Sequence, residues 1–296
     1  MATTHISTQE IPGSVFFTEG NNDLPKVVIK TAWSTAELYL HGAQVTHFQK
    51  TGEPPVLWMS QLSRFEAGTP IRGGIPVIFP WFGPREDMPS HGFARTQTWD
   101  LREISQLPGG AVSLRLGLPD SAQAALLPSF KADLWITVGK TLAVELVVTN
   151  SSTTDEFPFE CCFHTYFHLG GIDATSISGL QGAEYIDQCD KFARKIDHAD
   201  QIRIAQETDR IYLNTTGPVE IRDSRLGRRI RVDKTGSFST VVWNPWIAKA
   251  QQMPDFGSDE YLEMVCVESG NVNDNSITLP AGKSACLKIE LSTLPL

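Results

Sequence analysis

Two histidines, His164 and His168, lie four residues apart at the end of an aromatic-rich segment. On a β-strand both side chains would point to the same side, which makes a metal pair one candidate chemistry. A zinc site also needs a third ligand and an open coordination position. No acidic residue lies at metal-ligand spacing here, so we predict no metal. A histidine among aromatic residues usually fills the core, but His164 ends an apolar strand, where loops begin. It is therefore also a candidate for the border of a cleft.

Glu268 is the acidic counterpart, because it follows four apolar residues at 264–267. An acid in this place is either the first solvated residue after a strand or a carboxylate held at a cleft. Asp209 by itself is typical of a turn. Trp243, in the Trp-Asn-Pro-Trp sequence at 243–246, is most simply part of a packed turn, although tryptophans beside a cleft often stack on sugar faces.

Residues 72–95 concentrate the groups that could bind a ligand. The stretch begins with Arg72 and two glycines, continues through four prolines and an apolar centre, and ends at Arg95. Glycine permits a positive φ or a close approach, and proline removes backbone donors, so neither a helix nor a central strand is expected. Stiff loops that present guanidinium groups and an imidazole, here His91, often form binding sites. The alternative is a loop that covers the core and has two surface arginines.

Short strands must position these residues. Apolar residues alternate with polar ones at 111–118 and 141–149, a period of two that marks half-buried strands. Gly139-Lys140, between 132–138 and 141–149, predicts a hairpin. The remaining predicted strands are 26–31, 36–50 with a break at 41–42, 98–104, 157–167, 183–186, 210–213, 219–232, 240–243, 264–268 and 285–292. Helix is expected only at 120–127 and as one turn at 60–65.

Many short strands with turns between them and almost no helix predict an all-β fold, a β-sandwich. No repeat or linker interrupts the pattern, so we expect residues 1–296 to form a single domain. The net charge of −9 argues against a nucleic-acid partner, and an anionic ligand would need a local positive cluster. The arginines at 222–231 are more typical of a solvated face than of a nucleic-acid surface.

Five cysteines without a C-x-x-C pair indicate reduced thiols in a cytoplasmic protein. The first dozen residues are polar and are expected to be loose, and they lack the basic and apolar regions of a signal peptide. No uncharged apolar run approaches the ~20 residues needed to cross a bilayer, so no membrane partner is expected.

Six motifs, in this order along the chain, resemble those of the glucose-6-phosphate 1-epimerases, or hexose-6-phosphate mutarotases, of the aldose 1-epimerase superfamily. They are RGGIPVIFPWFGP (72–84), HGFAR (91–95), HTYF (164–167), TDRIY (208–212), WNPW (243–246) and VCVE (265–268), and they extend over about two-thirds of the chain. The resemblance implies a large antiparallel β-sandwich of the galactose-mutarotase (supersandwich) type, in agreement with the strand pattern.

The resemblance also implies roles for individual residues. His164 matches the family's acid and Glu268 its base. Five further residues match positions that hold or lie near the sugar phosphate: Arg72 and Arg95 for the phosphate, His91 and Asp209 for hydroxyl groups, and Ser90 beside the ligand. Trp243 is added as a binding candidate because tryptophans beside a cleft often stack on sugar faces. Residues after Glu268 depart from the family's bacterial pattern and are closer to Glu-x-Gly-x-Val.

Interconversion of α and β anomers needs a base that takes the proton of the C1 hydroxyl and an acid that protonates the ring oxygen. Neither a metal nor an organic cofactor is required. We expect the two groups on opposite sides of the pyranose, with Glu268 setting the acid limb of a bell-shaped pH profile and His164 its alkaline limb.

The predicted function is therefore cofactor-independent mutarotation of a hexose 6-phosphate, D-glucose 6-phosphate in the first instance. The partner is a small phosphosugar, and we expect a monomer. Two alternatives stay open: a non-catalytic sugar-phosphate-binding module, which would not need both His164 and Glu268, and an aldose 1-epimerase for free hexoses, which would not need Arg72 and Arg95. A hydrolase or lyase is less consistent with the motifs.

Overall fold

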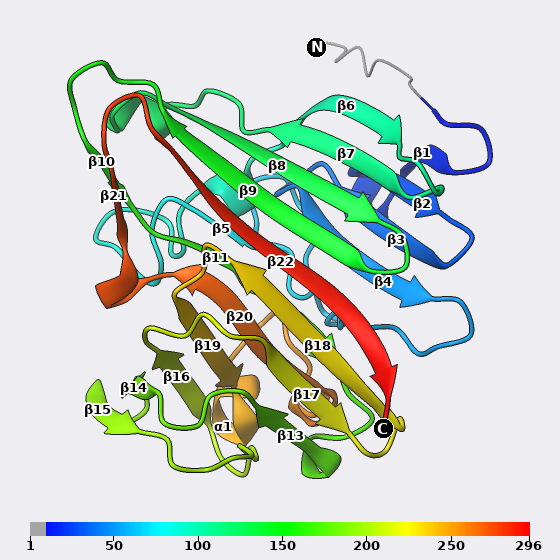
Figure 1. Ribbon diagram of the computed structural model, residues 1–296, viewed down its shortest axis with the longest axis vertical. Helices are drawn as coiled ribbons and strands as arrows, with labels where there is room; N and C mark the ends of the chain where they lie inside the picture. The colour runs from blue at the N-terminus through cyan, green and yellow to red at the C-terminus, as the bar shows by residue number, and fades with distance from the viewer. Residues whose placement is uncertain (1–9) are drawn as a thin grey trace.

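The computed structural model describes residues 10–296, so most of the N-terminal stretch expected to be loose lies outside the described residues (Figure 1). The described chain is built almost entirely of β-strands, and every pair of named strands is antiparallel. Four sheets contain the 22 strands. The predicted all-β antiparallel fold is confirmed.

One long sheet forms the first layer. Its strands are β6 (Asp100–Gln106), β7 (Val112–Gly117), β8 (Phe130–Val138), β9 (Leu142–Asn150), β13 (Thr175–Ser178), β17 (Val219–Asp223), β18 (Arg228–Thr235) and β22 (Ser284–Pro295). Their spatial order is β13-β17-β18-β22-β9-β8-β7-β6. Figure 1 shows β8, β9 and the C-terminal β22 side by side across the front of the molecule. In β9 every second residue is buried, as the alternation predicts.

A second sheet of eight strands forms the opposing layer. It contains β5 (Val77–Ile78), β11 (Cys161–Phe163), β12 (Tyr166–His168), β14 (Glu184–Asp187), β15 (Ala193–Ile196), β16 (Thr208–Tyr212), β19 (Ser239–Asn244) and β20 (Met264–Asn271). The order is β15-β14-β16-β19-β20-β11-β5, and β12 also pairs with β20. The central strand β20 therefore has β19 on one side and both β11 and β12 on the other.

Two smaller sheets complete the structure. A meander of β1 (Val15–Glu19), β2 (Pro25–Lys30), β3 (Ser34–Tyr39) and β4 (Gln44–Lys50) forms the N-terminal sheet, and β10 (Phe157–Phe159) pairs with β21 (Ile277–Leu279). The one α-helix of the described residues is α1 (Trp246–Ala250). The 3₁₀ helices are η1 (Asn21–Asp23), η2 (Ala94–Thr96), η3 (Ala124–Leu126), η4 (Ile172–Ala174), η5 (Glu260–Glu263) and η6 (Asn273–Asn275). No helix in residues 10–296 is long and apolar enough to cross a membrane.

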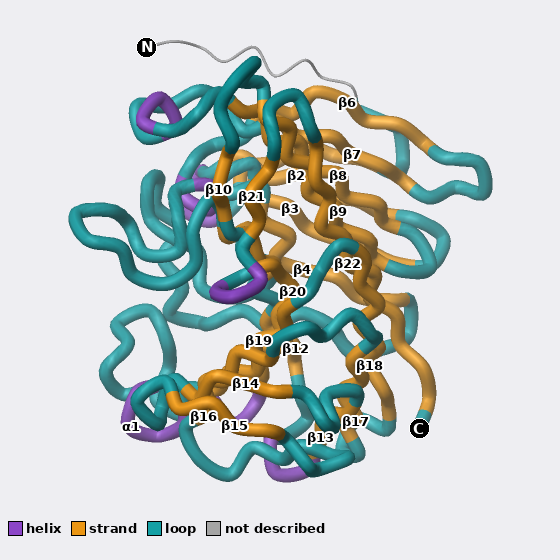
Figure 2. The backbone as a smooth tube through the Cα atoms, turned by 60° about the vertical axis from the view of Figure 1, so that its left-hand side comes forward, coloured by secondary structure: helices purple, strands orange, loops and turns teal. Residues whose placement is uncertain are grey.

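The two large sheets and the N-terminal sheet share one apolar core. Strand β20 shows how its two faces are divided. Val265 and Val267 point into this core, whereas Met264 and Cys266 pack into a separate cluster on the outer face with Tyr166. Viewed from the side, β16, β19 and α1 lie on one flank of the molecule, and β18 and β22 lie on the other (Figure 2). Polar residues at the outer positions of β20 thus face away from the core.

Most predicted strands are confirmed to within a few residues, including the hairpin at Gly139-Lys140, where β8 leads into β9. The break at 41–42 separates β3 from β4 as predicted. The helix predicted at 120–127 is wrong: only η3 forms there, because this short stretch has a proline on each side, at 119 and 128. The turn predicted at 60–65 is not helical either.

The strand predicted at 157–167 is three strands, because Glu160 and residues 164–165 leave the ladder between β10, β11 and β12. The loop at 72–95 is mainly irregular, as predicted, but its apolar centre supplies β5 at the edge of the second sheet. Five elements were not predicted: β1, β5, β13, β15 and β21. All are five residues or shorter, too short for a clear alternation.

Candidate active site

A cleft of about 390 Å³ on the outer face of the second sheet contains all eight residues proposed from the sequence. Its lining includes Arg72, Ser90, His91, Arg95, His164, Asp209, Trp243 and Glu268. These residues come from five separate parts of the chain, spread over almost 200 positions. Only the tertiary structure brings them together.

Strand register places three of these residues in adjacent rows. In the ladder β16-β19-β20, Asp209 lies opposite Trp243, and Trp243 lies opposite Cys266. In the next row of the same face, Val241 lies opposite Glu268. His164 follows β11 directly, and its preceding residue, Phe163, pairs with Ser269. The end of β11 therefore delivers His164 next to Glu268.

The two proton-transfer candidates are in direct contact. His164 Nε2 lies 3.3 Å from Glu268 Oε1, and their side chains are only 10% and 1% exposed. This contact differs from the expected arrangement, in which the two groups flank the pyranose from opposite sides. The chemistry explains the difference: the ring oxygen and the anomeric hydroxyl are both bonded to C1, so the groups that serve them must also converge.

An aromatic shell holds the imidazole of His164. Its ring stacks on Tyr166 with 4.8 Å between the centroids and 9° between the planes, and the ring of Trp243 packs against it in a T-shaped arrangement with 6.1 Å between the centroids. The backbone N–H of His164 donates to the carbonyl of Pro76, which fixes the residue to the 72–95 loop. Its Nδ1 is buried and has no hydrogen-bond partner in the described residues.

Burial shifts both members of the pair toward their uncharged forms. Burial, supported by the charge of Asp209, raises the pKa of Glu268 well above its ordinary value. Burial lowers the pKa of His164, and so do its neighbour His91 and the charges of Arg95 and Arg72. Both shifts favour the arrangement in which the carboxyl group carries the proton and the imidazole is neutral.

The two arginines differ in their surroundings. The guanidinium of Arg72 forks onto the carboxylate of Asp255, with Nε–Oδ2 and Nη2–Oδ1 distances of 3.2 and 3.3 Å, and donates to the Tyr166 hydroxyl at 2.9 Å. Burial opposes its charge, but Tyr166 and Asp255 more than offset burial and raise its pKa. Arg72 is thus a fixed and largely compensated cation.

Arg95 has no acidic partner of this kind among residues 10–296. Its Nη2 donates to the carbonyl of Ser90 at 2.8 Å, and its Nε is buried without a partner in the described residues. Burial and the charge of Arg72 lower its pKa to about 10, which leaves it protonated at neutral pH. Unlike Arg72 and Lys249, which are paired with carboxylates, Arg95 is a cation of the cleft without a carboxylate partner among residues 10–296.

His91 and Asp209 present polar groups suited to hydroxyls. The backbone N–H of Gly83 donates to His91 Nδ1 at 3.2 Å, so a neutral His91 has its proton on Nε2. Burial and the nearby arginines lower the pKa of His91 to about 3, which keeps it neutral. Gln188 donates to Asp209 at 2.6 Å, and burial raises the pKa of Asp209 to about 6.

Glycines allow the 72–95 loop its close contacts, as predicted. Gly74 has a φ of +60°, and a Cβ there would overlap the carbonyl oxygen of Val45. Gly92, next to His91, has a φ of +69°, and a Cβ there would overlap the carbonyl oxygen of Phe79. Any larger residue would force the loop away from the sheet and displace His91.

The sequence interpretation missed several residues of the site. Gln188 and Lys249 line the cleft, and Lys249 Nζ lies 3.9 Å from Asp209. Tyr166 and Asp255 hold Arg72. Tyr166 lies inside the HTYF motif, and Lys249 follows WNPW by three residues, so both had a local signal. Gln188 and Asp255 lie in stretches with no periodic pattern, and nothing in the sequence marks them.

Comparison with known proteins agrees with this geometry. The family model described as Aldose 1-epimerase matches residues 25–292. The chain belongs to the aldose 1-epimerase family. A protein of Cenchrus ciliaris named "Putative glucose-6-phosphate 1-epimerase" is 33% identical over 282 residues, which is 92% of this chain and 85% of its own. The predicted family and class of enzyme, a sugar epimerase, are confirmed.

Solved structures confirm the fold type of this aldose 1-epimerase. A crystal structure described as a "putative mutarotase" from Salmonella typhimurium has a TM-score of 0.89 and 29% identity, covering 97% of this chain and 96% of that one. A galactose mutarotase related enzyme from Lactobacillus acidophilus has a TM-score of 0.72 and 15% identity, covering 91% and 97%. The latter shows the fold alone, and that fold is the predicted galactose-mutarotase sandwich.

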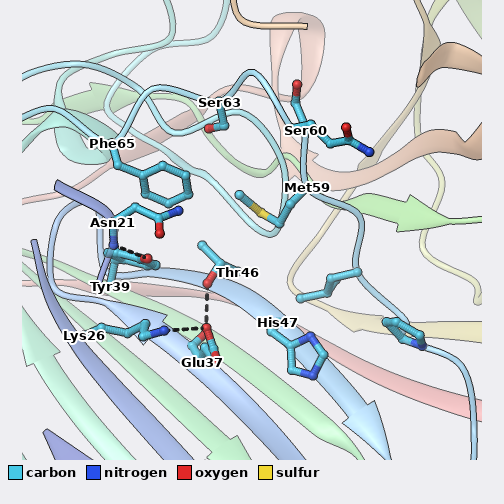
Figure 3. A pocket seen from close by; sticks show the side chains of 13 residues that line it. Asn21, Lys26, Glu37, Tyr39, Thr46, His47, Met59, Ser60, Ser63 and Phe65 are labelled. Atoms are coloured by element: carbon cyan, nitrogen blue, oxygen red, sulfur yellow. Dashed lines mark hydrogen bonds and ion pairs between the residues drawn. The ribbon is translucent and has the colours of Figure 1, made fainter. Parts of the chain in front are cut away.

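A second and larger cleft, of about 470 Å³, lies on the N-terminal sheet (Figure 3). Its charged residues, Lys26 and Glu37, form an ion pair at 2.9 Å, and the rings of Tyr39 and Phe65 pack at 5.0 Å. None of the eight predicted residues lines it. Glu37 and His47 also line this cleft, but the carboxylate is paired with Lys26, no arginine of the described chain lines it and none of the six motifs reaches it, so its size does not make it the active site.

His164 and His168, the alternative metal pair, do not come together in the cleft. His168 belongs to β12, where it pairs with Met264, and it does not line the cleft. The backbone bends at Thr165, whose N–H donates to the carbonyl of Phe163. The two histidines are therefore not on one continuous strand, the geometry on which the pair depended.

Proposed function

We propose that this epimerase interconverts the α and β anomers of a hexose 6-phosphate, with D-glucose 6-phosphate as substrate, and that it needs no cofactor. The observation that supports this most directly is the 3.3 Å contact between His164 Nε2 and Glu268 Oε1 in a cleft that also contains two arginines. The name of the Cenchrus ciliaris relative includes the same substrate.

His164 and Glu268 act as acid and base in this proposal. Glu268, in its ionised form, takes the proton of the C1 hydroxyl while the His164 imidazolium protonates the ring oxygen, and the C1–O5 bond breaks. Rotation about C1–C2 presents the other face of the aldehyde. Ring closure then runs with the roles exchanged, so protons balance over the cycle. Because the two groups touch, the single proton of the pair can move from Glu268 to His164, which generates the carboxylate and the imidazolium that start the reaction.

Arg95 and Arg72 receive the phosphate, with unequal roles. Arg95 has free donors and no acidic partner, so it is the principal ligand. Arg72, already held by Asp255 and Tyr166, supplies a second fixed charge. Guanidinium forks suit this task because they stay charged and match phosphate oxygens. This local cluster resolves the conflict between an anionic substrate and a net charge of −9.

The remaining residues orient the sugar ring. His91 donates through Nε2–H, Asp209 accepts from hydroxyls, and the Ser90 segment and Trp243 border the ring. Such contacts hold the anomeric carbon next to the acid and base, which is where positioning contributes to rate.

Two-dimensional exchange NMR on glucose 6-phosphate, with galactose and glucose in parallel, tests the proposal. Cross-peaks between α and β anomers of the phosphosugar should grow with enzyme concentration, and far less so for free sugars. Equal acceleration of free and phosphorylated sugars would favour the aldose 1-epimerase alternative. No acceleration by folded protein would favour the binding module.

We also propose that the enzyme works as a monomer in the cytoplasm. Its five cysteines all lie within residues 10–296 and are free, two of them exposed, which suits a reducing compartment. Light scattering at working concentration and fractionation of cells test the two statements separately.

A further inference from the structure

The catalytic pair has a third neighbour that the proposed reaction does not use, the thiol of Cys266. His164, Cys266 and Glu268 each offer one ligand atom, and these atoms all lie within 4.8 Å of one another. All three residues are buried, at 8%, 0% and 1% exposure. A nitrogen, a sulfur and a carboxylate oxygen in one place form a donor set typical of zinc.

The fold brings these donors together on one face of the second sheet. Cys266 and Glu268 are two residues apart on β20, so both point to the outer face of the second sheet. Cys266 is paired with Tyr166 on one side and Trp243 on the other. The same two aromatic rings pack against the imidazole of His164. One cluster thus sets the position of the thiol and of the imidazole.

The thiol of Cys266 is the donor with no polar partner: it makes no hydrogen bond among residues 10–296, where burial and Glu268 raise its pKa. His164 Nε2, the ring atom that would bind the ion, faces Glu268 Oε1 at 3.3 Å. By contrast, Glu268 Oε2 already accepts a hydrogen bond from the other nearby thiol, Cys162, at 3.6 Å, which leaves Oε1 for His164 and a cation.

We propose that His164, Cys266 and Glu268 form a three-ligand site for zinc or a similar borderline-soft divalent cation, and that its occupation reversibly inhibits the epimerase. The inhibitory consequence rests on the proposed function, whereas the site itself does not. Three protein ligands and a fourth position open to the cleft are the composition of many exchangeable zinc sites. In a site with bonds of 2.0–2.3 Å the donors lie roughly 3.3–3.8 Å apart, so a contraction of about 1 Å is needed.

Proton balance follows from the resting state of the three groups. The ion displaces one proton from the Cys266 thiol and one from the Glu268 carboxyl, while His164 binds through the lone pair of Nε2 and keeps its proton on Nδ1. Binding should therefore release close to two protons, seen as a dependence of the measured binding enthalpy on the buffer. The ion occupies the lone pair and the carboxylate oxygen that proton transfer requires. Sugar phosphate and cation should thus compete.

Cobalt(II) is the first probe, because thiolate ligation gives an intense near-ultraviolet charge-transfer absorption that nitrogen and oxygen ligands do not. Protein stripped with EDTA should bind one equivalent with this absorption, and zinc should displace it. Cys266→Ala and the isosteric Cys266→Ser should both lose the absorption, and their apparent zinc affinity should fall about tenfold or more. The controls are Cys162→Ser, which alters the other thiol beside Glu268, and Cys189→Ser, an exposed thiol; both should retain the absorption.

Activity provides the second measurement. The rate with buffered zinc, divided by the rate without it, should be low for the native protein and for both control variants. It should be close to one for the Cys266 variants. EDTA should restore the rate of the inhibited proteins. Absence of the cobalt absorption in native protein, or unchanged zinc inhibition after Cys266→Ala, would overturn the proposal. The cobalt titration contains no sugar. The metal-site proposal can therefore be overturned while the epimerase activity is observed, and the metal site can be found in a protein that has no epimerase activity.

Discussion

Asp255 occupies the guanidinium fork of Arg72, with contacts of 3.2 and 3.3 Å, whereas Arg95 has only the backbone carbonyl of Ser90. Two arginines that look equivalent in the sequence are therefore electrostatically different. Arg72 is compensated before any ligand arrives, and Arg95 is not. The phosphate should restore to Arg95 the anionic partner that the protein does not supply.

The first prediction concerns this difference. Arg95→Ala should raise KM for glucose 6-phosphate by about 10- to 150-fold, the equivalent of roughly 1.5–3 kcal/mol for a charge-assisted hydrogen-bonding group. KM for free glucose should change little. Steady-state kinetics on both sugars measures the contrast, with Arg115→Ala, an arginine of β7 outside the cleft, as the control. Equal losses on both sugars would mean that Arg95 serves the fold and not the phosphate.

The second prediction concerns the acid and base. His164→Asn and Glu268→Gln preserve size and hydrogen-bonding capacity but remove the titrating proton, so each should lower kcat by about 10²–10⁴ and leave KM nearly unchanged. The double variant should lose little more, because the two groups in contact act as one unit. A folded Glu268→Gln protein with near-native kcat would contradict the mechanism.

The third prediction is the pH profile. The pKa of Glu268 is raised and that of His164 is lowered, so the pair keeps one proton over a wide pH range. A second proton adds to the imidazole only below its ordinary pKa of 6.5, and the carboxyl loses its proton only above its ordinary pKa of 4.5. The bell in kcat/KM should thus have its acid limb from His164 and its alkaline limb from Glu268, the reverse of the order expected from unperturbed groups.

Measured kcat/KM between pH 4 and pH 10 tests this order, with protein stability followed in parallel so that unfolding is not mistaken for titration. The alkaline limb should disappear in any residual activity of Glu268→Gln, because the amide has no proton to lose. An alkaline limb that persists in Glu268→Gln and disappears in His164→Asn would restore the original assignment.

The fourth prediction concerns the stability of the loop that presents His91. Gly92→Ala should lower the free energy of unfolding by roughly 2–5 kcal/mol, because it combines a left-handed backbone with an overlap at the Phe79 carbonyl. Gly52→Ala is the matched control, since Gly52 also has a positive φ, +79°, but open space around it. It should cost only about 1–2 kcal/mol in denaturant unfolding. Equal costs would show that the loop moves to accept the methyl group.

Local chemistry explains why the strands could be predicted from the sequence. In β9, Leu142 and Val144 face the core while Ala143 and Glu145 do not, and this alternation is visible without any partner strand. Prediction failed where the pattern was too short, as in β5, and where a proline-bounded stretch favoured a helix that no packing supports, as at 120–127. Tertiary pairing with β11 makes β5 a strand, whereas the stretch at 120–127 lacks the packing that a short helix needs.

The sequence by itself indicated eight residues of the cleft, because the motifs that contain His164, Glu268, Arg95 and their neighbours occur together in the family's order. Only the tertiary structure decided how these residues are related. Strand register sets Glu268 beside His164 and places Cys266 within reach of both, and a residue 183 positions away compensates Arg72. Distance and burial determine charge state, and both are properties of the packed sheets. That is why the directions in which burial shifts these two pKa values could not be predicted from the chain alone.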